Sequence, residues 1–296
     1  MRGPEARNLA AELQLLLLEG LLQAPTLAGV QWIFHGGTAL HLAWRSPRFS
    51  EDLDFLVAVA RTPEGVALAH RAAQEALSWA QGALDGAGRA VRLELRQRPQ
   101  RAACEVRATA PGLGGPVRVR LDFWPAGPDG LAPYATTLKT LSGPVAVPMV
   151  HLHTPVRVAT LQAAWLDKAV ALLARERLKV RDLFDLWWIE THADFDPPGR
   201  EAIKAALPHY QAAYRLPPAD AARAAALARL DEAAGDGASR VRDGLRPWLP
   251  EAVWAHLTAA DAPRAMLECA AAAVETLAET LNEVIPDGGP DHEPEF

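Results

Sequence analysis

The sequence predicts an α+β fold in its first half and an all-helical second half. Short segments between residues 30 and 124 alternate apolar and polar side chains, as half-buried strands do. From about residue 160 the apolar positions follow the 3.6-residue period of a helix instead. We therefore expect a core domain over 1–155, a helical domain over 156–285, and a disordered tail over 286–296, which is rich in proline, glycine and acidic residues.

The composition is that of an ordinary folded protein. The chain has 296 residues, of which 50% are hydrophobic and 22% charged, and this balance argues against a disordered chain. The net charge of −6 argues mildly against a long surface that binds nucleic acid.

The charge is unevenly distributed. Between residues 86 and 121, only Glu94 and Glu105 oppose a group of arginines: Arg89, Arg92, Arg96, Arg98, Arg101, Arg107, Arg118 and Arg120. This group is compatible with two structures. It forms either a solvated, ion-paired sheet surface or a surface that receives an RNA backbone, since arginine suits phosphate contacts.

The N-terminal segment and the cysteines bear on localisation. An apolar run over 13–22 is interrupted by Gln14 and Glu19, so it predicts an amphipathic helix rather than a signal peptide or a membrane span. Cys104 and Cys269 lie far apart in the sequence and suggest no disulfide framework. Reduced, buried thiols are expected, and these fit a cytoplasmic protein.

Strands and helices can be assigned through the core. Five strands are expected, over 30–34, 52–59, 91–98, 104–108 and 117–124. A helix is expected over 62–82, and short connections between the later strands favour antiparallel pairing. Thr154-Pro155 predicts a loop around His151 and His153, and we expect no metal there because no cysteine or further histidine lies nearby.

Gly36-Gly37-Thr38 lies between an expected strand and an expected short helix over 39–44. A Gly-Gly turn lets the backbone approach an anion closely. The helix after it offers unpaired N–H groups and the positive end of its dipole, and Thr38 adds a hydroxyl. The turn therefore predicts a seat for a triphosphate, whereas His35 before it is expected to be a packed histidine.

Asp52 and Asp54 alternate on one strand and so project from the same face. Two carboxylates there can ligate Mg²⁺, with Mn²⁺ as the alternative ion, together with triphosphate oxygens. Asp122, on the polar face of a later strand, is the best third carboxylate; Glu94 and Glu105 rank lower because each lies among arginines that can pair with it. Either motif alone is common, but their order and short spacing together predict a nucleotide site.

Four motifs in order resemble those of the AbiEii/AbiGii toxin family. They are FHGGTAL over 34–40, RFSEDLDF over 48–55, KAVALLAR over 168–175 and RDLFDLW over 181–187. Members of that family are nucleotidyltransferase-like toxins of bacterial abortive-infection and toxin–antitoxin systems. The resemblance covers about 31–188 and implies a polymerase-β-like core with a mixed or antiparallel sheet, followed by a helical domain.

The resemblance implies roles for individual residues. Nucleotide binding is implied for Gly36, Gly37, Thr38, Ser50, Lys168 and Arg181. Metal binding is implied for Asp52 and Asp54, and a catalytic role for these two together with Lys168, Asp182 and Asp185. The assignment of Asp122 as a third metal-binding and catalytic residue rests on the strand pattern instead. The chain has Asp167 where the family often has a longer acid.

Without the resemblance, Lys168 would be interpreted as a solvated helix lysine. Asp182 and Asp185 lie three residues apart on one helical face, and on chemistry alone they would be a surface pair bridging to Arg181 or Arg177. The nine tryptophans are expected to pack within the core and between helices rather than to stack on bases.

The expected reaction is transfer of a nucleoside monophosphate from an NTP to an acceptor, with release of pyrophosphate. The resemblance points to RNA, in particular the 3′ end of tRNA, and to a cognate antitoxin partner. Two alternatives stay open. One is a nucleotidyltransferase acting on a protein or small molecule, which suits the acidic net charge, and the other is a non-catalytic NTP-binding module.

Overall fold

The computed structural model describes residues 4–98, 101–127, 130–132, 134–142, 151–214, 216–235 and 237–284. The chain forms two compact units, residues 1–160 and 161–296. Among the described residues, the first contains the sheet and the second contains helices without strands, which confirms the predicted fold class. The boundary expected at residue 155 falls within strand β7 (His151–Ala159), and the expected tail over 286–296 lies outside the described residues.

The first unit is built on one mixed sheet of seven strands in the order β3-β4-β5-β2-β1-β7-β6. The strands are β1 (Trp32–His35), β2 (Asp52–Val57), β3 (Arg92–Gln97), β4 (Ala103–Thr109), β5 (Val117–Pro125), β6 (Thr136–Ser142) and β7. The antiparallel pairing predicted for the later strands is confirmed in β3–β4 and β4–β5. Two pairs are parallel, β2 with β5 and β1 with β7.

The prediction of a loop around His151 was wrong, because this segment belongs to β7, which pairs with β6 and β1. Pro155 suggested a break, since proline cannot donate to a strand ladder. The β6–β7 ladder is irregular between Lys139 and Leu141, and an irregular ladder is a place where a sheet tolerates proline.

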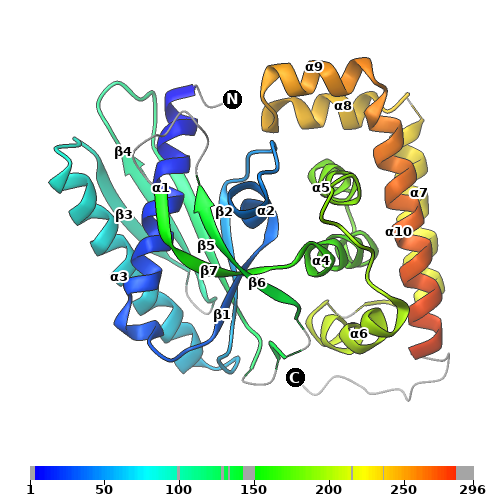
Figure 1. Cartoon of the computed structure of the whole chain (residues 1–296), viewed down its shortest axis with the longest axis horizontal. Helices are drawn as coiled ribbons and strands as arrows, with labels where there is room; N and C mark the ends of the chain where they lie inside the picture. Colours follow the sequence, from blue (N-terminus) through cyan, green and yellow to red (C-terminus); the bar gives the residue numbers. More distant parts are fainter. Residues whose placement is uncertain are drawn as a thin grey trace. The chain divides into compact units, whose positions relative to one another are not determined.

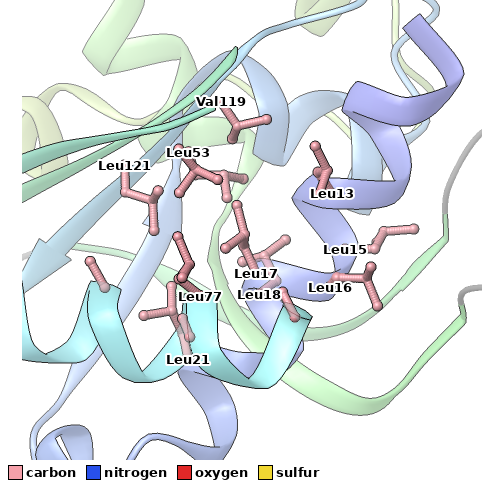
Figure 2. Packing of buried hydrophobic residues seen from close by; sticks show 14 of the residues in the cluster. Leu13, Leu15, Leu16, Leu17, Leu18, Leu21, Leu53, Leu77, Val119 and Leu121 are labelled. Atoms are coloured by element: carbon pink, nitrogen blue, oxygen red, sulfur yellow. The ribbon is translucent and has the colours of Figure 1, made fainter. Parts of the chain in front are cut away.

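Helices α1 (Pro4–Gln23) and α3 (Pro63–Gly86) cover one face of the sheet. Figure 2 shows leucines of both helices gathered against inward-pointing strand residues, among them Leu13, Leu17, Leu53, Leu77 and Leu121. Because side chains alternate along a strand, burial of Leu53 and Leu121 turns their neighbours in sequence to the opposite face of β2 and β5. Those neighbours include the predicted carboxylates.

Helix α1 is not amphipathic as expected, because polar residues on it are also buried. Glu12 is 8% exposed and Gln14 is fully buried. Each has a tertiary partner: Arg89 forms an ion pair with Glu12 at 2.8 Å, and Gln14 Nε2 donates to the carbonyl oxygen of Ser50 at 2.7 Å.

Among the described residues, no helix is both long and apolar enough to cross a membrane.

The second unit consists of helices α4 (Leu161–Ala174), α5 (Val180–Glu190), α6 (Arg200–Tyr214), α7 (Ala219–Ala234), α8 (Ser239–Leu245), α9 (Glu251–Ala259) and α10 (Ala262–Val284). Helix α10 runs alongside α7 and also contacts α4, α5 and α6 (Figure 1). Its buried side includes Met266, Val274 and Leu277. Cys269 on this helix is partly buried, Cys104 in the first unit is buried, and both are free thiols.

Candidate active site

The glycine turn lies directly against one of the predicted metal-binding carboxylates. Strand β1 ends at His35 and helix α2 (Gly36–Trp44) begins at Gly36, which has φ +78°. A Cβ atom at Gly36 would lie 2.5 Å from Oδ2 of Asp54. Glycine is therefore favoured at this position by its backbone conformation, and a larger residue there would displace the Asp54 carboxylate.

Gly37 packs in the same way against two other side chains of the motif. A Cβ atom there would collide with the guanidinium of Arg48 and lie 2.9 Å from Oγ of Ser50. Arg48 is only 2% exposed, and its Nη1 donates to the carbonyl oxygen of Phe49 at 3.0 Å. A buried cation therefore lies beside the predicted phosphate seat. The sequence pattern predicts no role for Arg48, although its place two residues before Ser50 in the motif was the available signal.

Thr38 is fully buried, and its hydroxyl donates to the backbone carbonyl oxygen of Asp52. This bond ties the first turn of α2 to β2, so it helps to hold the glycine turn beside the carboxylates. Because the hydroxyl proton is donated to the Asp52 carbonyl oxygen, we now expect the backbone N–H of Thr38, rather than its hydroxyl, to contact a phosphate.

The three predicted metal ligands lie on one face of two adjacent strands. Asp52 and Asp54 are half-buried on β2, with Leu53 buried between them. Strand β5 pairs with β2 in parallel, which places Asp122 beside Asp54 and Arg120 beside Asp52. The structure thus brings together the carboxylates that the sequence analysis selected.

Arg120 lies between two of these carboxylates. Its Nη2 is 2.9 Å from Oδ2 of Asp52, and its Nε is 2.7 Å from Oδ2 of Asp122. Burial raises the pKa of Asp122 above its ordinary value, even though the charge of Arg120 opposes the shift. From the sequence, Arg120 belongs only to the arginine group; its place two residues before Asp122 on the same strand was the signal for this pairing.

The carboxylates suit a metal that is shared with a substrate. Within the described part of the chain, no three Asp, Glu, His or Cys residues are already grouped as a metal site. Mg²⁺ is commonly held by one or two carboxylates together with substrate phosphates, so Asp52 and Asp54 beside the glycine turn fit its chemistry. Glu94 and Glu105 do pair with neighbouring arginines, with Arg96 at 3.3 Å and Arg107 at 2.5 Å respectively, and their lower rank as metal ligands stays a prediction.

The helical unit contains a second cluster of predicted residues. Lys168 Nζ on α4 lies 2.9 Å from Oδ1 of Asp182 and 2.8 Å from Oδ2 of Asp185, both on α5. Asp182 is 4% exposed and Asp185 is fully buried, and Arg175 is a further partner of Asp182. The chemistry-only interpretation, a surface pair bridging to an arginine on either side, is therefore wrong.

Two other residues of this unit have identified neighbours. The guanidinium of Arg181 lies 4.2 Å from the ring centroid of Trp248, a cation–π contact. The carboxylate of Asp167 accepts a hydrogen bond from the hydroxyl of Tyr210 at 2.5 Å. The nucleotide-binding role of Arg181 stays a prediction.

A family model described as "Nucleotidyl transferase AbiEii toxin, Type IV TA system" matches residues 20–256. The chain belongs to this family. The match confirms the resemblance seen in the four motifs and makes the protein a nucleotidyltransferase toxin of a type IV toxin–antitoxin system. Such a system includes an antitoxin, and nucleotidyl transfer uses an NTP and, in general, a divalent metal.

Solved structures similar to the AbiEii chain share little sequence with it. MenT4, the nucleotidyltransferase toxin Rv2826c from Mycobacterium tuberculosis H37Rv, is 14% identical with a TM-score of 0.46, over 92% of this chain and 93% of that one. JHP933 from Helicobacter pylori is 16% identical with a TM-score of 0.43, over 96% of both chains. A putative nucleotidyltransferase from H. pylori is 15% identical with a TM-score of 0.42, over 91% of this chain and 95% of that one. None of the curated proteins matches the chain.

Proposed function

We propose that this toxin transfers a nucleoside monophosphate from an NTP to the 3′ end of tRNA and releases pyrophosphate, with Mg²⁺ as the metal and Mn²⁺ as an alternative. The observation that carries the proposal is the approach of the Gly36 turn to Asp54, 2.5 Å from a Cβ atom at that glycine to the carboxylate oxygen. A turn that binds phosphate and a carboxylate that binds metal are useful only when the two lie side by side.

In this proposal Asp52 and Asp54 hold the metal, which supplies charge stabilisation at the α-phosphate when bound. The acceptor hydroxyl oxygen bonds to the α-phosphorus while the bond from that phosphorus to the β-phosphate oxygen breaks, and pyrophosphate leaves. The proton of the hydroxyl goes to Asp122, whose raised pKa makes it a better base than an ordinary carboxylate.

Charge on the leaving pyrophosphate needs nearby donors and cations. Backbone N–H groups of the glycine turn supply donors, Ser50 supplies a hydroxyl, and Arg48 beside Gly37 supplies a buried cation. The family motifs support Lys168 as a further cation for the triphosphate.

Three residues of α5 complete the proposed assignment. Asp182 and Asp185 hold the Lys168 ammonium in position. Arg181 contributes to nucleotide binding.

We place the reaction in the cytoplasm, where NTPs and tRNA are found. The thiols support this location because both cysteines are free.

One observation favours a second candidate. The net charge of −6 is more typical of an enzyme that modifies a protein or a small molecule than of one that binds RNA along its whole surface.

The test is incubation of the purified chain with Mg²⁺, unfractionated tRNA and each α-labelled NTP in turn. We expect label to appear on tRNA, to be abolished by chelation with EDTA, and to be lost in the double variant Asp52→Asn/Asp54→Asn. The matched control is Asp243→Asn/Asp261→Asn, which makes the same chemical change at two exposed side chains and should label normally. If the wild-type chain binds NTP but transfers label only to protein or small molecules, the second candidate is correct.

A further inference from the structure

Six of the eight arginines noted in the sequence lie on the face of the sheet that bears the carboxylates. Outward-pointing positions of β3, β4 and β5 alternate with buried ones, and helix α3 packs on the other side of these strands. Six arginines and two glutamates occupy the outward positions of this arginine face: Arg92, Glu94, Arg96, Arg98, Glu105, Arg107, Arg118 and Arg120. Asp122 lies on the same face, so six arginines and three carboxylates give it a net charge of +3 on a protein whose net charge is −6. Arg96, Arg107 and Arg120 form ion pairs with Glu94, Glu105 and Asp122.

The strand register connects the arginine face to the site. Asp54 pairs with Asp122, Asp122 pairs with Ala103 on β4, and the carbonyl oxygen of Ala103 accepts a hydrogen bond from the N–H of Arg98 at 3.1 Å. The next row of paired positions across the sheet runs from Asp52 on β2 to Arg120 on β5, then across β4 to the edge strand β3. With strands about 4.8 Å apart, the edge arginines lie about 14 Å from β2, a span of a few nucleotides.

Trp124 adds an aromatic surface at the other end of this face. It lies two residues after Asp122 on β5, about 7 Å further along the strand, and is 41% exposed. Among the described residues, the large hydrophobic side chains that are exposed are Trp124 and Leu138. Trp124 is therefore not fully packed within the core, as the tryptophans were expected to be.

We propose that the arginine face together with Trp124 is the binding surface for the acceptor RNA. The arginines contact its phosphates and Trp124 stacks on a base near the 3′ end, so that the terminal hydroxyl reaches Asp52 and Asp54. This inference rests on the proposed function. Rows of cations beside an exposed aromatic ring are typical of surfaces that bind single-stranded nucleic acid, whereas a protein partner needs a larger apolar centre than one tryptophan.

The first experiment measures binding of unfractionated tRNA, in Mg²⁺ without NTP, as a function of salt concentration. The variant is Arg92→Gln/Arg96→Gln/Arg98→Gln on the exposed edge of the sheet. Loss of three phosphate contacts should reduce the slope of log K against log salt by about 2 to 3 and weaken binding about a hundredfold at 0.15 M salt. The control Arg71→Gln/Arg240→Gln/Arg264→Gln removes the same charge from exposed positions elsewhere and should bind as the wild type does.

The second experiment separates stacking from charge. Trp124→Leu should weaken tRNA binding by about 5- to 150-fold while leaving the salt slope unchanged. Polyglutamate serves as an acidic polypeptide probe. If the triple-arginine variant weakens polyglutamate binding as much as tRNA binding, the face is a docking surface for acidic proteins and the inference is wrong.

Failure of this inference can be told apart from failure of the proposed function. If the wild type labels tRNA from NTP and the triple-arginine variant binds tRNA as tightly, the acceptor is RNA but this face does not hold it. If the wild type neither labels nor binds tRNA, both proposals fail.

Discussion

Replacement of Gly36 by alanine tests whether the placement of Asp54 is needed for transfer. The φ angle of +78° is costly for alanine, by about 1–2 kcal/mol of folding free energy. The new Cβ atom would also lie 2.5 Å from Asp54 Oδ2, whereas ordinary contacts begin at 3.4 Å, so the carboxylate must move by about 3.4 − 2.5 = 0.9 Å. A displacement of this size at a reacting centre lowers a rate by about a hundredfold.

Gly29 offers a matched control for the backbone cost. Its φ angle is +76°, and a Cβ atom there meets nothing within 4 Å. Gly29→Ala and Gly36→Ala should therefore lose similar stability in thermal unfolding, because a carboxylate can move at little energetic cost.

Only Gly36→Ala should lose about a hundredfold in the single-turnover rate of nucleotidyl transfer. Equal rates in the two folded variants would refute the placement of the active site at this turn.

Three further predictions concern the charged groups. Burial raises the folded-state pKa of Asp122, so its ionised form costs folding free energy at neutral pH. Asp122→Asn should therefore be at least as stable as the wild type at pH 7 in chemical denaturation, with the difference vanishing below the ordinary value of 3.8. A difference between the two proteins that moves in favour of the wild type as pH rises through this range would contradict the prediction. Lys168→Met leaves the fully buried Asp185 without the Lys168 ammonium and should cost about 3–5 kcal/mol of folding free energy, whereas Lys204→Met, at a more exposed helix position, should cost less than about 1 kcal/mol. Arg120→Gln removes a cation that competes with the metal for Asp52. Two partly exposed ion pairs contribute at most about 2 kcal/mol together, so Mn²⁺ binding, followed by electron paramagnetic resonance, should tighten by up to about thirtyfold. Weaker binding would show that Arg120 assists the metal.

Features encoded by neighbouring residues were predictable. The alternation of Asp52, Leu53 and Asp54 predicted both the strand and the shared face of the carboxylates, since side chains in a strand alternate regardless of their partners. The glycine turn was recognisable because a strand, two glycines and a helix follow within a few residues.

Two features could not be predicted because tertiary contacts outweigh the local sequence signal. Pro155 indicated a loop, yet β7 continues through it because β1 and β6 flank it and the ladder is irregular nearby. In α1, Gln14 looked like the polar side of an amphipathic helix, but its side chain is buried in the core, where its Nε2 donates to the Ser50 carbonyl oxygen.

The sequence by itself determined the fold class, the family and the candidate residues, because periodicity and motifs are properties of adjacent positions. The tertiary structure decided how the charges are paired. Arg120 meets Asp52 across 68 residues only because β5 pairs in parallel with β2, and Lys168 meets Asp182 and Asp185 only because α4 packs on α5. The free energy of a charge depends on what surrounds it in space, and spacing along the chain does not specify those surroundings.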